Sequence, residues 1–267
     1  NFGGGKAVLN LKGIKKTPEL YQSYAEAVDI LKGEYLTAGD VNTFREDLIE
    51  CSKITKYVYG INVETSAPTS RGLFHAIKNT YNFINDNKDI RDIHVAISGV
   101  GKVGSKLAKL LFESGAKVTV ASINLESINE LKKEIGLIEV KAENLFKTSC
   151  DIISPCALGG IINKSNKSQF KCKAIVGAAN NQLDNSETGE WLLKHNIIYA
   201  PDYLVNSGGV IAIASEINGT ENLLEQQLEK ISDRLRFVLK ESNKNNESTD
   251  SVAKRIAWER INSSGAI

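Results

Sequence analysis

The chain has 267 residues, of which 42% are hydrophobic and 24% charged, and these values are typical of a folded globular protein rather than a disordered or fibrous one. Its 33 basic residues nearly balance its 32 acidic residues, which argues against nucleic acid or an anionic membrane as a partner. We therefore expect a small-molecule substrate. No apolar run approaches the length of a membrane span, and the four cysteines show no metal-ligand spacing, so we expect a cytoplasmic protein without a metal site.

The first part of the chain predicts helices between irregular segments. A helix is expected over 17–31, because Thr17 can cap it, Pro18 suits its first position and Gly33 follows its end. A second helical pattern follows residues 37–40, and a third runs from Pro68 toward residue 85.

From residue 93 onward, short β-branched runs alternate with helical stretches. Runs of this kind predict strands that are buried on both faces of a parallel sheet, with helices as the crossover connections. The chain is therefore expected to contain a doubly wound α/β domain. The expected strands are 94–98, 117–121, 151–154, 173–176 and 197–200. Beyond Gly209 the pattern is helical, with amphipathic helices expected over 221–242 and 251–262 and a polar loop over 243–250.

A glycine-rich motif, GVGKVG, connects the first expected strand to a helix. In a strand-turn-helix context this spacing predicts a dinucleotide site: Gly99 permits the tight turn, Gly101 lets backbone N–H groups approach the pyrophosphate, and Gly104 allows close helix packing. Lys102 and Val103 belong to the same turn. The alternative is a strand-to-helix turn with a structural role alone.

Ser122 ends the second expected strand, where NAD-binding domains usually carry an aspartate or glutamate for the adenine ribose. A serine can hydrogen-bond a hydroxyl and tolerate a 2′-phosphate, and Glu126 lies a turn beyond it. We expect NAD as the cofactor, with NADP left open.

Five motifs occur in an order that resembles the amino-acid dehydrogenases of the glutamate/leucine/phenylalanine/valine superfamily, and they look most like its leucine dehydrogenase branch. The motifs are GGGK at 3–6, TAGDV at 37–41, CDIISPCALG at 150–159, GAANNQL at 177–183 and YAPDYLVNSGGV at 199–210. The resemblance implies reversible oxidative deamination of a branched-chain L-amino acid to its 2-oxo acid and ammonia. It also implies a homo-oligomer.

The same resemblance implies two catalytic residues. Lys6, presented by the glycine-rich loop, would polarise the carbonyl group and activate water, and Asp40 would shuttle protons. A lysine desolvated in a cleft and facing a carboxylate suits general acid–base catalysis. Taken alone, the two residues also fit a solvated lysine and a helix N-cap.

Further site residues follow from the resemblance. Thr69 and Asn180 match residues that contact the nicotinamide, whereas Asn206, Gly5 and Ala38 match substrate-binding positions. From the residues alone, Thr69 also suits a helix N-cap, and the amide before Gly208 suits an ordinary turn. A small residue at position 38 would leave space for a branched apolar side chain.

The resemblance implies two domains with a cleft between them, lined by Lys6 and Asp40 on one wall and by Thr69, Asn180 and Asn206 on the other. The expected boundaries are 1–68 for the remainder of a smaller α/β substrate domain, 69–216 for the dinucleotide-binding domain, and 217–267 for helices that pack back on the first domain. In the family a preceding segment carries another lysine, which binds the substrate carboxylate, and the given chain begins two residues before the GGGK motif. A non-catalytic dinucleotide-binding relative therefore stays open as an alternative.

Overall fold

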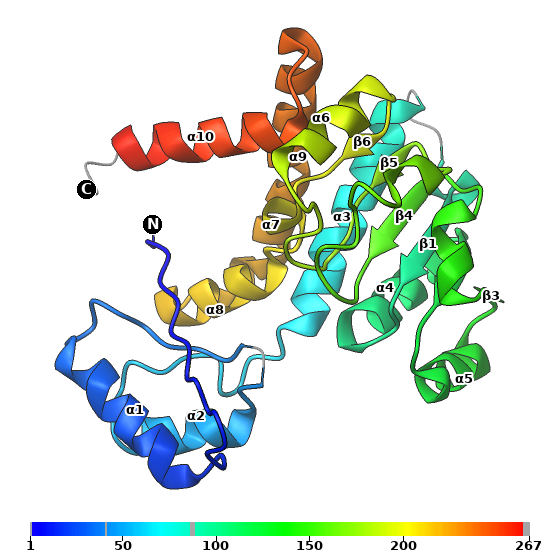
Figure 1. Ribbon diagram of the computed structural model, residues 1–267. Coiled ribbons are helices and arrows are strands. Elements are labelled where there is room, and N and C mark those ends of the chain that lie inside the picture. Colours follow the sequence, from blue (N-terminus) through cyan, green and yellow to red (C-terminus); the bar gives the residue numbers. More distant parts are fainter. Residues whose placement is uncertain (1, 41, 86–88, 264–267) are drawn as a thin grey trace. The chain divides into compact units, whose positions relative to one another are not determined.

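The computed structural model describes residues 2–40, 42–85 and 89–263 (Figure 1). The contacts divide the chain into two compact units. The smaller unit comprises Asn1–Thr65 and Ala212–Glu221, and the larger one comprises Ser66–Ile211 and Asn222–Ile267.

The smaller unit is built on two packed helices, α1 (Pro18–Ile30) and α2 (Arg45–Ser52). Thr17 caps α1 by accepting a hydrogen bond from the Leu20 N–H, which confirms the predicted start of this helix. The packed helices bury a small apolar cluster that includes Tyr21, Ala25, Leu48 and Cys51. Since α2 begins at Arg45, Asp40 is not its N-cap.

The larger unit contains a parallel sheet, which confirms the predicted doubly wound α/β fold. Within the described residues its strands run in the order β3-β2-β1-β4-β5-β6, so the chain reverses direction across the sheet between β1 and β4. The two-residue edge strand β3 is not among the strands predicted from the sequence. The strands are β1 (His94–Ser98), β2 (Lys117–Ala121), β3 (Ile138–Glu139), β4 (Ile152–Pro155), β5 (Ala174–Ile175) and β6 (Ile198–Tyr199).

Both faces of this sheet are covered, as the apolar strand runs predict. Val95 and Ile97 of β1 join one core cluster with residues of α3, α4 and α9, whereas Ala96 between them joins a second cluster on the opposite face. The larger unit's longer helices are α3 (Ser66–Ile84), α4 (Lys102–Glu113), α5 (Leu125–Glu134), α6 (Ser186–Lys194), α9 (Leu224–Asn245) and α10 (Thr249–Ser263). The four-residue helix α7 (Asp202–Val205) and then α8 (Gly208–Asn218) follow β6 along the chain.

Short 3₁₀ turns complete the described secondary structure. They are η1 (Ile90–Asp92), η2 (Ala142–Lys147), η3 (Lys167–Gln169) and η4 (Glu221–Leu223). No helix within the described residues is both long and apolar enough to cross a membrane.

The C-terminal helices pack against other elements of the larger unit. Residues from 222 onward group with the larger unit, because α9 packs along α3 and α10 contacts α9, α6 and β6 (Figure 1). Gly72 on α3 allows the close approach, since a Cβ there would lie 2.6 Å from Ile231 Cδ1. The loop predicted over 243–250 is shorter in the structure, because α9 continues to Asn245 and α10 starts at Thr249. Asn246 caps the end of α9 in the left-handed conformation (φ 50°).

We predict that Gly104→Ala destabilises the larger unit, although alanine is the better helix former. A Cβ at this position would lie 2.0 Å from the backbone oxygen of Gly99, so α4 must shift away from β1. The expected loss in the free energy of unfolding is about 1–3 kcal/mol, as for an overpacked core. Denaturant unfolding of the variant and of wild type measures it.

Ser105→Ala in the same helix is the control, because the Ser105 hydroxyl donates to the Gly101 carbonyl one turn earlier in the chain. A Gly104→Ala protein as stable as this control would contradict the tight packing of α4 against the turn.

Candidate functional site

The turn between β1 and α4 has the backbone geometry that a dinucleotide pyrophosphate requires. Gly99 is in the left-handed region (φ 92°), and a Cβ there would lie 2.7 Å from Ala157 Cβ. Gly104 approaches the Gly99 carbonyl too closely for any side chain. Gly101, the N-cap of α4, is different: a Cβ built on it meets nothing within 4 Å. The N-terminus of α4 therefore faces open space, where its N–H groups and dipole favour an anion.

This turn lies at the carboxyl ends of the central strands, where the strand order reverses. β1 pairs with β2 on one side and with β4 on the other, and the Cys156 N–H after β4 donates to the Ser98 carbonyl of β1 at 2.8 Å. In open α/β sheets, ligands bind in the crevice at this switch point. The turn between β1 and α4 therefore suits a dinucleotide both by its backbone geometry and by its position in the sheet.

Ser122 follows β2 directly beside the glycine turn. The Gly99 N–H donates to the carbonyl of Ala121 at 2.7 Å, and the Ser122 hydroxyl accepts from the Asn124 N–H at 3.1 Å. Asn124 in turn caps α5, whose first turn carries the exposed Glu126. The Ser122 hydroxyl keeps its own proton to donate, and it brings no charge to this position.

Two of the predicted site residues, Asn180 and Asn206, meet by their side chains. Asn206 Nδ2 donates to Asn180 Oδ1 at 2.6 Å and to the Ala178 carbonyl at 3.1 Å. Gly159 supports Asn180, because a Cβ on Gly159 would lie 2.2 Å from the Asn180 backbone oxygen. The loops after β4, β5 and β6 therefore converge on this pair.

Thr69 lies inside α3, which begins at Ser66, so it is not the helix N-cap. A Cβ on Gly208 would lie 2.3 Å from the Pro68 oxygen and 2.7 Å from Thr69 Cα. The sequence suggests that Gly208 belongs to an ordinary turn. In the structure it also allows two backbone segments to approach closely, because it has no side chain. It brings the first turn of α3 next to the segment that carries Asn206.

Lys6 and Asp40 form an ion pair in the smaller unit. Their side chains are 67% and 46% exposed, so the desolvation expected for a catalytic lysine is not present in this structure. The physical reason is local: residues 2–10 form no helix or strand, and Gly3 and Gly4 have no neighbour within 4 Å of a built Cβ. Gly5, in contrast, lies against the Tyr35 ring, where a Cβ would be 2.9 Å from Cε2.

Ala38 lies near Gly60 in the same unit. A Cβ built on Gly60 would lie 3.9 Å from Ala38 Cβ and 3.5 Å from Ile213 Cδ1. Gly60 itself is left-handed (φ 75°), and its N–H donates to Glu216 Oε2 at 2.8 Å. No local motif in the sequence marks Gly60 or Ile213.

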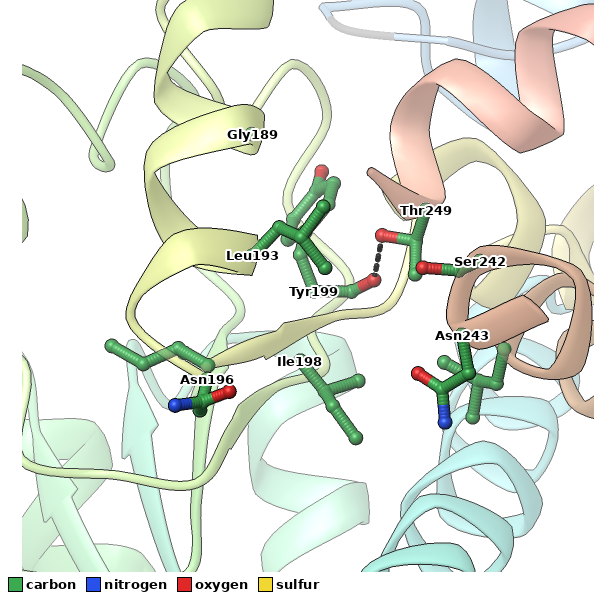
Figure 2. A pocket seen from close by; sticks show the side chains of 10 residues that line it. Gly189, Leu193, Asn196, Ile198, Tyr199, Ser242, Asn243 and Thr249 are labelled. Atoms are coloured by element: carbon green, nitrogen blue, oxygen red, sulfur yellow. Dashed lines mark hydrogen bonds between the residues drawn. The ribbon is translucent and has the colours of Figure 1, made fainter. Parts of the chain in front are cut away.

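A cavity of about 220 Å³ lies elsewhere in the larger unit, among α6, β6, α9 and the start of α10 (Figure 2). Figure 2 shows the Thr249 hydroxyl bonded to the Tyr199 carbonyl at its edge. None of the predicted site residues lines this cavity. Within the described residues, no group of three or more His, Cys, Asp or Glu side chains is arranged to hold a metal ion, and the four cysteines are free thiols.

Comparison with known proteins identifies the family. Residues 60–261 match the family model described as glutamate/leucine/phenylalanine/valine dehydrogenase. The chain is 38% identical to phenylalanine dehydrogenase of Thermoactinomyces intermedius, over 98% of this chain and 74% of that protein. It is 35% identical to leucine dehydrogenase of Geobacillus stearothermophilus, over 98% and 73% of the two chains.

A solved structure supports the same family assignment. The crystal structure of L-tryptophan dehydrogenase from Nostoc punctiforme superposes with a TM-score of 0.84 at 33% identity, covering 95% of this chain and 75% of that one. The predicted resemblance to this superfamily is thereby confirmed. The chain belongs to the glutamate/leucine/phenylalanine/valine dehydrogenase family, and it is an amino-acid dehydrogenase with a dinucleotide-binding fold.

Proposed function

We propose that the chain catalyses the reversible, NAD-dependent oxidative deamination of an apolar L-amino acid, with a leucine-like side chain, to its 2-oxo acid and ammonia. The observation that carries this proposal is the Lys6–Asp40 ion pair. An exposed pair of this kind contributes only about 0–1 kcal/mol to stability, so the fold has little need of it. A cation beside a proton acceptor is what the deamination chemistry requires.

The dinucleotide would be held by the glycine turn and the residues around it. Gly99, Gly101, Lys102, Val103 and Gly104 would take the pyrophosphate at the N-terminus of α4, and Ser122 the adenine ribose. Thr69 and Asn180 would hold the nicotinamide end. When bound, the nicotinamide accepts the hydride that the substrate α-carbon loses.

Lys6 and Asp40 would carry the proton transfers. The Lys6 ammonium would stabilise the negative charge that develops on the substrate oxygen as water adds and ammonia leaves. The Asp40 carboxylate, in contact with Lys6 Nζ, would accept a proton from the attacking water and return it to the departing amine. Asn206 would bind the substrate through its amide.

The side chain of the substrate would be apolar because Ala38 offers a small apolar side chain, with Gly60 near it. Burying a charged or polar side chain there without a partner would be costly. A branched aliphatic side chain suits a small residue at position 38. Aromatic amino acids are the second candidate class, favoured by the similarity to phenylalanine and tryptophan dehydrogenases.

The first test is turnover of the full-length natural protein with L-leucine, L-valine, L-phenylalanine and L-tryptophan. We predict NADH, ammonia and 2-oxo acid in equal amounts. Lys6→Ala and Asp40→Asn should each lower kcat by about 10²-fold or more, because both act on the reacting carbon. The affinity for NADH should stay nearly unchanged.

Lys15→Ala removes an exposed lysine of the same unit and is the matched control, with an expected kcat close to that of wild type. Full activity of the Lys6→Ala protein would refute its catalytic role. A wild type that binds NADH but oxidises none of the four amino acids would support the non-catalytic alternative.

The second test concerns NAD against NADP. Ser122 carries no charge, so it does not repel a 2′-phosphate as a carboxylate would, and the preference for NAD over NADP should be modest. The preference should still favour NAD, because the nearby Glu126 carboxylate disfavours the 2′-phosphate of NADP. Ser122→Asp should sharpen this preference, and kcat/KM for NADP should fall about tenfold or more relative to NAD.

Ser122→Asn has nearly the shape of the aspartate variant without its charge, and it should leave the ratio close to that of wild type. A wild type that uses NADP many times better than NAD would show that another group binds the phosphate.

A further inference from the structure

A buried polar network lies behind the two asparagines, and its centre is Gln182. This side chain is fully buried, and its Nε2 donates to the Gly177 and Ala179 carbonyls, both at 2.9 Å. The carbonyl between them, that of Ala178, accepts from Asn206 Nδ2. Three successive carbonyls before Asn180 are thus held, the outer two by Gln182 and the middle one by Asn206.

Asp202 links this segment to the one that carries Asn206. Its Oδ2 accepts from the Gln182 N–H at 2.8 Å, and its Oδ1 accepts from the Tyr203 N–H at 2.6 Å. Its own carbonyl accepts from the Asn206 N–H at 2.9 Å. One buried residue therefore fixes both the loop after β5, with Asn180, and the turn of α7, which leads into Asn206.

Tyr199 is the third side chain of this buried network. Its hydroxyl accepts from the Asp202 N–H at 3.3 Å. Burial raises the pKa of Tyr199, and the nearby Asp202 carboxylate raises it further, so the hydroxyl stays neutral.

One group of this network, the side-chain oxygen of Gln182, lowers the stability of the fold. Gln182 Oε1 is buried and has no hydrogen-bond partner in the described part of the chain, and leaving an acceptor unpaired costs about 1–3 kcal/mol. Stability alone would favour an apolar side chain that fills the same space. The two bonds from Nε2 require a glutamine, because among side chains of this length and shape only its amide donates twice.

We propose that Gln182 and Asp202 are positioning residues, which hold the Asn180 and Asn206 side chains in register for hydride transfer between substrate and nicotinamide. This inference rests on the proposed function. Neither residue needs to touch the substrate or the cofactor; both act through the backbone segments that carry the asparagines. A displacement of about 1 Å in such a group lowers a rate by up to about 10²-fold.

The test uses Gln182→Met, which keeps the length and loses both donated bonds, and Asp202→Asn, which can accept only one of the two backbone bonds. Each should lower kcat with L-leucine about tenfold or more. The primary isotope effect measured with α-deuterated L-leucine should rise, because hydride transfer becomes more nearly rate-limiting. The dissociation constant of NADH should change by less than about threefold.

Thr80→Val is the matched control, since the Thr80 hydroxyl is fully buried in α3 and bonds the Ala76 carbonyl, away from the asparagines. Melting temperatures of all variants identify loss of fold, and Asp202→Asn decides the matter if Gln182→Met does not fold. If the wild type is active and both variants have the same kcat and isotope effect as Thr80→Val, the positioning role is wrong but the proposed function stands. A wild type without turnover would overturn the proposed function and this inference with it.

Discussion

The close approach of α4 to the turn after β1 is the constraint on which the larger unit's binding site depends. Gly104 lies so near the Gly99 carbonyl that no Cβ fits between them. This contact fixes the N-terminus of α4 at the carboxyl end of β1, beside β4, where the sheet reverses its order. The helix dipole and the free space at Gly101 then coincide at one point, and an anion is favoured there.

Glycines also support the neighbouring parts of this site. Gly159, Gly177 and Gly208 each bring two backbones closer than a side chain would allow: Gly159 to Asn180, Gly177 to Pro155, and Gly208 to Pro68 and Thr69. Close backbone contacts therefore place Asn180 in the loop after β5 and bring Thr69, in the first turn of α3, next to the segment of Asn206 that follows β6. Side-chain packing in the sheet below provides the rigid base.

The sequence predicts the parallel sheet and the glycine turn because both depend on local patterns, the buried apolar runs and the GxGxxG spacing. It does not predict β3, which is only two residues long, has both residues exposed and contains a single apolar residue, Ile138. It does not predict which elements the C-terminal helices pack against, because amphipathicity shows that a helix packs, but not against what. Gln182 and Asp202 were missed for a related reason: their partners are backbone groups, which a sequence does not reveal.

The most direct measurement of the central claim is the affinity of the Gly101→Ala protein for NADH. Gly101 has an ordinary φ of −74° and no neighbour within 4 Å of a built Cβ, so alanine fits the free protein. A methyl group there would occupy space next to the N-terminus of α4, where the pyrophosphate is expected. We predict an unchanged melting temperature and a dissociation constant raised about tenfold or more, equivalent to about 1.4 kcal/mol. NADH binding as tight as that of wild type would contradict the assignment of this turn to the dinucleotide.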